Sequence, residues 1–166
     1  SSPAPDVDVI LVAGGTGRRF GGDVPKQFQL LGGRPMLLVA ASRFVAVPGV
    51  ARLIVVVADE ARRLCEDLLA PLGLPLRFAS PGAERQHSVA NGIAASDGSA
   101  SLLAVHVAAR PLVRPANVAA CIAAARTHGA AVLATPVPDT VKRVCDGRIV
   151  ATVPRADLWL AQTPQI

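Results

Sequence analysis

The chain has 166 residues, of which 51% are hydrophobic and 17% charged, so it is long enough for one domain with a buried core and too short for two ordinary domains. Lysine and arginine number 17 against 12 acidic residues, and the formal net charge of +5 suits an anionic partner. Aromatic residues make up only 3% of the chain, which argues against the stacking surfaces that bind single-stranded nucleic acid. We therefore expect a small phosphorylated ligand and no nucleic acid.

The cysteines and the apolar runs exclude further classes of protein. Cys65, Cys121 and Cys145 are odd in number and fit neither a CxxC nor a Cys/His spacing, which argues against a disulfide framework and a zinc site. No apolar run reaches the ~18 residues of a membrane helix, and no signal-peptide pattern is present. We expect a cytoplasmic protein with no membrane partner, preceded by a disordered leader over residues 1–6.

Strand and helix patterns alternate from residue 7 to residue 135. Residues 7–13 (VDVILVA) form a short β-branched run that ends in glycines, which is typical of a strand buried on both faces. Similar runs predict strands over 52–58, 74–80, 102–106 and 131–135. Helical spacing, together with proline and glycine breakers, predicts helices over 34–47, 59–73, 84–95 and 117–129.

This alternation predicts an α/β fold. We expect a single Rossmann-like domain over residues 7–166, with a mostly parallel, twisted sheet flanked by helices. After residue 136 the pattern changes, because TVKRV and IVATV flank a Cys-Asp-Gly-Arg turn, which indicates a β-hairpin. We expect a protruding hairpin arm at about 137–155 that pairs with a second subunit.

The segment after the first strand, VAGGTGRRFGGDVPKQF (12–28), combines glycines with positive charge. Glycine lets a phosphate approach the main-chain N–H groups. The dinucleotide fingerprint fails because Phe20 stands at its third glycine, and the P-loop fails because Asp23 stands at its lysine. Two readings stay open: a flexible basic loop, or a loop whose cations Arg18, Arg19 and Lys26 surround a polyphosphate and stabilise charge during phosphoryl or nucleotidyl transfer.

Five motifs in order resemble the sugar-phosphate cytidylyltransferases, in particular the 2-C-methyl-D-erythritol 4-phosphate cytidylyltransferases of the non-mevalonate isoprenoid pathway. They are AGGTGRRFGGDVPKQF, GAERQHSV, HVAARPLV, PVPDTVKRV and TVPRADLWLAQTPQ, and they extend from residue 13 to residue 165. The resemblance implies an enzyme that transfers a cytidylyl group from CTP to 2-C-methyl-D-erythritol 4-phosphate and releases pyrophosphate. It also implies a homodimer, and Mg²⁺ carried mainly by the CTP triphosphate, with no metal ligand from the chain.

The resemblance also implies roles for individual residues. Arg19 and Lys26 would be catalytic and stabilise charge at the α-phosphate. The residues that would bind the nucleotide are Ala13, Gly14, Gly15, Thr16, Gly17, Gly82, Ala83, Arg85, Ser88 and Ala108. Those that would bind the sugar-alcohol phosphate are Arg110, Thr135, Thr140 and Arg155, of which Thr140 and Arg155 would reach the neighbouring subunit's site.

The chain departs from the family pattern in two places. Val107 stands where the family has an aspartate near the metal, and valine offers no oxygen ligand. The family continues after the last motif with a strand and a helix that carry a lysine and an aspartate, and these are absent from the sequence given. The alternatives are therefore a ribitol-5-phosphate cytidylyltransferase, an impaired nucleotide-binding pseudoenzyme and, disfavoured by Phe20, a nicotinamide-binding dehydrogenase.

Overall fold

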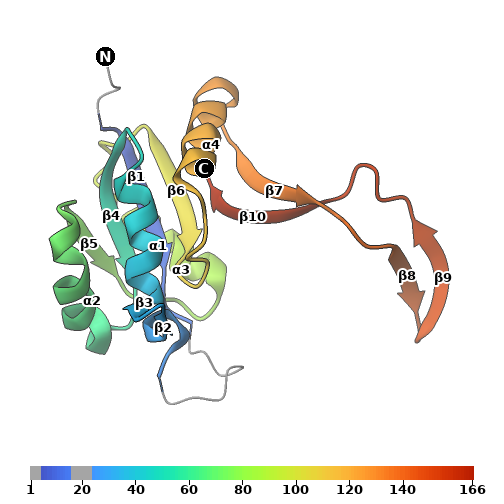
Figure 1. Ribbon diagram of the computed structural model, residues 1–166, viewed down its shortest axis with the longest axis horizontal. Coiled ribbons are helices and arrows are strands. Elements are labelled where there is room, and N and C mark those ends of the chain that lie inside the picture. The colour runs from blue at the N-terminus through green and yellow to red at the C-terminus, as the bar shows by residue number, and fades with distance from the viewer. Residues whose placement is uncertain (1–4, 16–23) are drawn as a thin grey trace.

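A computed structural model of the chain describes residues 5–15 and 24–166. In this part of the chain a six-stranded sheet has the order β5-β4-β1-β6-β10-β7 (Figure 1). Its strands are β1 (Val7–Val12), β4 (Val50–Val56), β5 (Leu76–Ala79), β6 (Leu102–Val107), β7 (Val132–Pro136) and β10 (Trp159–Gln165). β1, β4, β5 and β6 are parallel, whereas β10 runs antiparallel to both β6 and β7. The predicted mostly parallel α/β sheet is confirmed.

α1 (Met36–Val45) and α4 (Pro115–His128) end at the expected proline and glycine breakers. α1 follows Pro35 and ends before Pro48 and Gly49, and α4 begins with proline and ends at Gly129. α1 buries Leu37, Ala40, Ala41 and Phe44, the spacing of one helical face. The other helices are α2 (Arg62–Leu69), α3 (Arg85–Ala94) and the short 3-10 helices η2 (Lys26–Phe28), η3 (Asp59–Ala61) and η4 (Ala70–Leu72).

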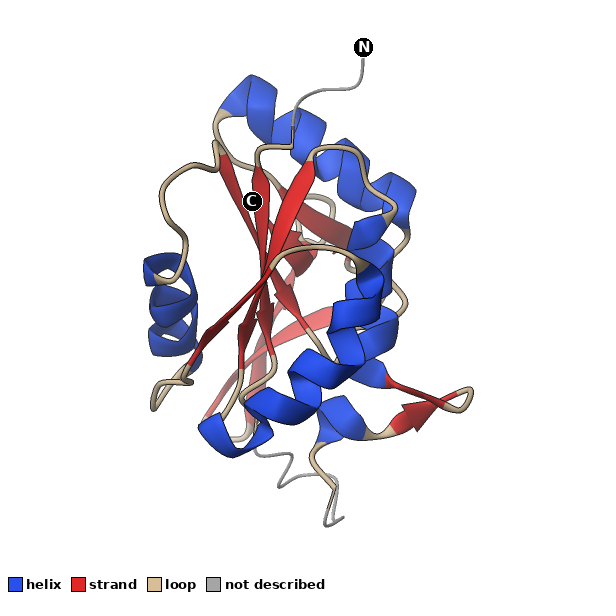
Figure 2. Ribbon diagram, turned by 90° about the vertical axis from the view of Figure 1, so that its left-hand side faces the viewer, coloured by secondary structure: helices blue, strands red, loops and turns tan. Residues whose placement is uncertain are grey.

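Helices cover both faces of the sheet (Figure 2). α1, α2 and α4 share one face, where Phe44, Leu69 and Ile122 join the core around β1 and β4. α3 lies on the opposite face and packs so closely that a Cβ on Gly92 would come within 2.5 Å of Ile10 Cγ2. The right-handed connections between parallel strands therefore bring the loops after β1, β5 and β6 to one edge of the sheet.

Three details differ from the sequence-based expectation. The helix predicted over 59–73 is divided into η3, α2 and η4. Pro71 has no N–H to continue the α-helical ladder, which explains why α2 ends before η4. β10 was not predicted as a strand. Asp6, which we placed in the leader, pairs with Arg126 at 2.5 Å and its backbone N–H donates to the Gly49 carbonyl, so Asp6 belongs to the folded domain.

A hairpin projects from the body between β7 and β10 (Figure 1). It consists of β8 (Val141–Cys145) and β9 (Arg148–Val153), which pair in antiparallel fashion around a turn with Asp146 at φ 46° and Gly147 at φ 74°. A smaller antiparallel pair, β2 (Leu30–Leu31) and β3 (Arg34–Pro35), precedes α1. The predicted hairpin is confirmed, and its role in dimerisation stays a prediction.

Within residues 5–15 and 24–166, every helix is too short or too polar to cross a lipid bilayer.

Candidate functional site

A cleft of about 640 Å³ lies at the carboxyl ends of the parallel strands. Residues from the loops after β1, β5 and β6 line it. The order of the strands reverses at β1, because the chain passes from β1 to β4 and β5 on one side and then crosses to β6 on the other. Open α/β sheets bind their ligands at such a point. The described lining residues are Val12, Ala13, Gly14, Gly15, Lys26, Gln27, Gly82, Ala83, Glu84, Arg85, Ser88, Val107, Ala108 and Ala109.

Two adjacent glycines in the loop after β1 have different surroundings. A Cβ on Gly14 would lie 2.5 Å from Cβ of Pro81, which belongs to the loop after β5. A Cβ on Gly15 would meet no heavy atom of residues 5–15 and 24–166 within 4 Å. Gly14 therefore lets the two loops touch, whereas the backbone at Gly15 faces open space that a ligand can enter.

The loop after β5 is held against α3 by a second close contact. A Cβ on Gly82 would come within 2.2 Å of His87 Cβ. The Gly82 N–H donates to Ser88 Oγ at 3.0 Å, and the Ser88 hydroxyl donates to the Glu84 carbonyl at 3.3 Å. Ser88 is buried, so its hydroxyl fixes the main chain of this loop.

Positive charge and helix geometry both favour an anion in this cleft. Lys26 enters from η2, and Arg85 is the first residue of α3. The amino end of α3 faces the cleft with its unpaired backbone N–H groups, and its cap residue Glu84 makes no side-chain capping bond. The Glu84 carboxylate accepts instead from the Gln86 amide at 2.8 Å.

The lining does not fit a magnesium site built by the protein. Mg²⁺ requires several oxygen ligands, and Val107 offers none. Glu84 is the single carboxylate among the described lining residues, and the described parts of the chain contain no group of three or more Asp, Glu, His or Cys placed to hold a metal ion.

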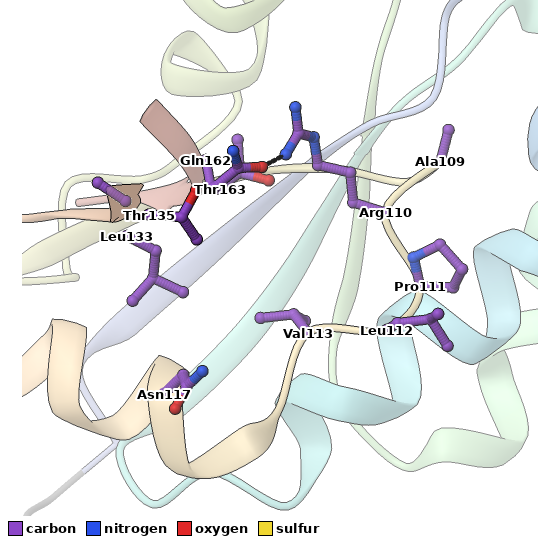
Figure 3. Close-up of a pocket in the computed structure, with 11 residues that line it drawn as sticks. Ala109, Arg110, Pro111, Leu112, Val113, Asn117, Leu133, Thr135, Gln162 and Thr163 are labelled. Atoms are coloured by element: carbon purple, nitrogen blue, oxygen red, sulfur yellow. Dashed lines mark hydrogen bonds between the residues drawn. The ribbon is translucent and has the colours of Figure 1, made fainter. Parts of the chain in front are cut away.

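A second cavity of about 450 Å³ lies on the other side of the loop after β6 (Figure 3). Ala109 lines both cavities. The Arg110 guanidinium points toward β10 and donates to Gln162 Oε1. The lining combines an apolar floor with a few polar groups, and consists of Ala109, Arg110, Pro111, Leu112, Val113, Asn117, Leu133, Ala134, Thr135, Gln162 and Thr163.

His106, the next-to-last residue of β6, is fully buried beside this second cavity. Its ring lies 4.9 Å from the Phe44 ring in an edge arrangement. Nε2 is 3.0 Å from the Arg110 carbonyl and Nδ1 is 2.9 Å from Thr163 Oγ1. Burial lowers the pKa of His106 to about 4, so the ring is neutral at pH 7.

The structure brings together most of the residues proposed from the sequence. Nine of them line the first cleft, and Arg110 and Thr135 line the second. Thr140 and Arg155 lie at the base of the hairpin, where Arg155 donates to the Pro138 carbonyl, and they line neither cavity. Thr16, Gly17 and Arg19 lie outside the described residues. The nine are Ala13, Gly14, Gly15, Lys26, Gly82, Ala83, Arg85, Ser88 and Ala108.

Sequence reasoning missed His106, Gln162 and Thr163, although each touches Arg110 or the loop that carries it. A signal for His106 was available, because a single histidine stands inside the apolar run LLAVHV. A buried histidine requires hydrogen-bond partners for both ring nitrogens. The partner in β10 could not be found without recognising that segment as a strand.

The chain resembles known proteins over nearly its whole length. Residues 7–166 match the family described as IspD, 2-C-methyl-D-erythritol 4-phosphate cytidylyltransferase. A relative from Rhodospirillum rubrum named "Bifunctional enzyme IspD/IspF" is 44% identical over 160 residues, covering 96% of this chain and 42% of that protein. The chloroplastic 2-C-methyl-D-erythritol 4-phosphate cytidylyltransferase of Oryza sativa is 39% identical over 161 residues, covering 96% of this chain and 54% of the relative. The chain thus spans about half the length of these curated relatives.

Solved structures support the same assignment. The 4-diphosphocytidyl-2C-methyl-D-erythritol synthase of Anaerococcus prevotii has a TM-score of 0.85 and 25% identity, covering 96% of this chain and 69% of its own. The 2-C-methyl-D-erythritol 4-phosphate cytidylyltransferase of Thermus thermophilus has a TM-score of 0.72 and 35% identity, with coverages of 96% and 69%. The sequence match over residues 7–166 and the shared fold lead to one conclusion: the chain belongs to the 2-C-methyl-D-erythritol 4-phosphate cytidylyltransferase family.

Proposed function

We propose that this chain acts as a cytidylyltransferase that uses CTP and 2-C-methyl-D-erythritol 4-phosphate and forms 4-diphosphocytidyl-2-C-methyl-D-erythritol and pyrophosphate. The observation that carries the proposal is the 640 Å³ cleft, lined by glycine-rich main chain at the carboxyl ends of β1 and β5, in a chain that matches the family over residues 7–166. We keep the cytoplasm as the expected location.

In this proposal the main chain of three loops holds the nucleotide. Ala13 to Gly17 follow the triphosphate, and the open space at Gly15 supports that assignment. Gly82, Ala83, Arg85 and Ala108 surround the base and the ribose. Ser88 contributes by fixing the Gly82 N–H, because a hydroxyl that already bonds the loop keeps the backbone donors of that loop in place.

The reaction is an in-line displacement at the α-phosphorus of CTP. A phosphate oxygen of the sugar substrate forms the new P–O bond while the bond to the bridging oxygen of the β-phosphate breaks, and pyrophosphate carries away the electron pair. Negative charge is crowded around the α-phosphate in the transition state, and cations placed there lower the barrier. We assign this role to Lys26, which lines the cleft, and to Arg19. Magnesium enters with the substrate as Mg·CTP.

The sugar phosphate would occupy the second cavity. Arg110 provides a guanidinium for its phosphate, and Thr135 provides a hydroxyl. Thr140 and Arg155 line neither cavity of their own chain, so we infer that they act in the site of a second subunit.

The hairpin arm supports a homodimer. β8 and β9 pair only with each other in the described part of the chain, and an isolated two-stranded hairpin is at best marginally stable in water. The arm exposes Val144, Ile149 and Val150 at 57%, 66% and 57%. Apolar side chains gathered on such an extension are typical of an interface.

The first experiment measures pyrophosphate release from CTP with 2-C-methyl-D-erythritol 4-phosphate and, separately, with ribitol 5-phosphate. Release with the methylerythritol substrate, reduced about a hundredfold or more in Lys26→Ala, is expected. Release with ribitol 5-phosphate alone would show that the rival cytidylyltransferase reading is right.

A second experiment tests the crossed arms by mixing Lys26→Ala and Arg155→Ala chains. Each variant alone lacks one half of every site. In a mixed dimer one site contains both native residues, so random exchange should restore about one quarter of wild-type activity, since half of the dimers carry one complete site of two. No recovery after proven subunit exchange would mean that Arg155 serves its own chain.

A nucleotide-binding pseudoenzyme is the second candidate, and Val107 is the observation that favours it. Val107 lines the first cleft where a carboxylate would reach the metal or the substrate. A protein whose melting temperature rises with CTP, but which releases no pyrophosphate with either sugar phosphate, would fit this candidate.

A further inference from the structure

His106 links two segments that are far apart in sequence. Its Nε2 lies 3.0 Å from the Arg110 carbonyl in the loop after β6, and its Nδ1 lies 2.9 Å from Thr163 Oγ1 in β10. The side chain is fully buried and packs edge-on against Phe44 of α1. A rigid, buried ring with both nitrogens engaged has one orientation available.

The partners of His106 determine which ring nitrogen carries the proton. The Arg110 carbonyl can only accept, so Nε2 must be the donor. In a neutral ring Nδ1 is then an acceptor, and the Thr163 hydroxyl must donate to it. This leaves the oxygen lone pairs of Thr163 to accept from the Val107 N–H, 3.4 Å away. The four groups form one directed relay, from the Val107 N–H through Thr163 and His106 to the Arg110 carbonyl.

Arg110 is held at several points in addition to this relay. Its N–H donates to the Val107 carbonyl at 2.9 Å, its guanidinium donates to Gln162 Oε1, and Arg43 Nε donates to the carbonyl of the next residue, Pro111, at 3.3 Å. Gln162 and Thr163 are neighbours in β10. This strand therefore contacts the Arg110 guanidinium through Gln162 (Figure 3) and the Arg110 backbone through Thr163 and His106.

We propose that His106 is a positioning residue for Arg110: the directed relay through Thr163 fixes the imidazole, and the imidazole fixes the backbone from which the Arg110 guanidinium reaches the second cavity. The inference deepens the proposed function and rests on it, because Arg110 is the group that we assign to the sugar phosphate. His106 is absent from the described lining residues of the first cleft, which the relay meets only through the Val107 backbone, so we expect it to affect the sugar phosphate more than CTP.

The first test is independent of catalysis. Nitrogen-15 NMR of the imidazole rings in the native chain reports the tautomer of each of the three histidines, and the signals that disappear in His106→Gln belong to His106. A neutral Nε2–H ring at pH 7 is expected. Thr163→Val, whose side chain has the same shape without the hydroxyl, should keep this tautomer, because the Arg110 carbonyl still accepts from Nε2, but should shift the Nδ1 resonance, because Nδ1 loses its hydrogen-bond donor. A Nδ1–H ring in the native chain, or an unchanged Nδ1 resonance in Thr163→Val, would overturn the relay.

The second test uses a matched pair of amide variants. The amide nitrogen of Gln takes the place of Nε2, so His106→Gln keeps a donor for the Arg110 carbonyl, whereas the shorter Asn of His106→Asn reaches the position of Nδ1 and loses that donor. His106→Asn should raise KM for the sugar phosphate about three- to tenfold, the effect of one lost hydrogen bond, with a much smaller change in KM for CTP. His106→Gln should recover most of the loss.

The outcomes separate the inference from the function. Equal changes in both KM values, or equal effects of Gln and Asn, would mean that His106 supports the fold alone and would refute the proposal. If the native chain released no pyrophosphate with either sugar phosphate, the proposed function would fail. In that case an Nε2–H tautomer whose Nδ1 resonance depends on Thr163 would still support the relay, and a Nδ1–H tautomer would refute it.

Discussion

Two neighbouring glycines in the loop after β1 can be used to test separately the contact between two loops of the cleft and the space proposed for the ligand. A Cβ on Gly14 would lie 2.5 Å from Pro81 Cβ and 3.2 Å from Pro81 Cγ, whereas an ordinary contact is 3.4–4 Å. The shortfall is roughly 1 Å against a rigid ring, so the two loops must move apart in Gly14→Ala. Gly15→Ala adds the same methyl group, and no atom in the described part of the chain lies within 4 Å of it.

The expected stability difference follows from these distances. Overpacking costs ~1–3 kcal/mol, and replacing glycine by alanine returns ~0.4–1 kcal/mol by restricting the unfolded chain. Neither glycine has a positive φ, so alanine adds no backbone strain. Gly14→Ala should therefore lose about 0.5–2 kcal/mol, a fall in Tm of roughly 1–8 °C for a chain of this size. Gly15→Ala should melt at or slightly above the native temperature.

CTP binding should change in both variants, for different reasons. In Gly14→Ala the walls of the cleft separate, and in Gly15→Ala the new methyl group occupies the space assigned to the triphosphate. Calorimetric titration with Mg·CTP should show affinity lowered about tenfold or more in Gly15→Ala, the result of blocking close backbone approach. If Gly14→Ala and Gly15→Ala had the same melting temperature, the contact with Pro81 would not contribute to stability. If Gly15→Ala bound CTP normally, the nucleotide would not follow this loop.

Three further expectations concern charge. Val107→Asp should raise turnover on the order of tenfold and steepen its magnesium dependence, because it adds an oxygen ligand beside the cleft; unchanged steady-state rates would count against that role. The pKa of His106 is about 4 in the folded chain and ~6.5 in the unfolded chain, so the unfolded chain binds the proton more readily. The free energy of unfolding should therefore be highest above about pH 6.5 and fall on the order of 3 kcal/mol as the pH drops from about 6.5 to about 4. Urea titrations should show this loss in the native chain and not in His106→Gln; parallel pH profiles would refute it. The hydrogen bond from Arg126 lowers the pKa of Asp6, so Asp6→Asn should cost on the order of 0.5–1 kcal/mol at pH 7, and the difference should vanish as acid protonates Asp6 in the native chain; a difference that persists in acid would point to another cause.

The sequence predicted the parallel part of the sheet because strands buried on both faces have continuous β-branched runs. Residues 7–13 and 52–58 are such runs, and β1 and β4 lie within a few residues of them. β10 escaped prediction because Gln162 and Pro164 interrupt its apolar pattern. Its pairing is also irregular, since it pairs with β6 at Gln165 and a register shift between Ala161 and Gln165 interrupts its pairing with β7. Its strand state depends on long-range pairing that local pattern does not record.

The site was predictable in its backbone and less so in its contacts. The glycines at 14, 15 and 82 indicated the loops that line the cleft, because a position where another group must approach the main chain closely is typically occupied by glycine. The contact between Gly14 and Pro81 could not be predicted from the sequence, since it depends on how two loops that are far apart in sequence meet. The same holds for Thr163, whose hydroxyl matters only because β10 lies beside His106.

The path of the chain through the arm has a mechanical meaning. β7 leads out to β8, and β9 leads back into β10, so the two feet of the arm are neighbouring strands joined edge to edge. The inner half of β10 carries Gln162 and Thr163, which touch Arg110 and His106. A force on the tip of the arm is therefore transmitted to the sheet through β10, the strand that contacts Arg110. In the proposed dimer, docking of the arm on a second subunit and binding of the sugar phosphate would both restrict the movement of β10, from its two ends.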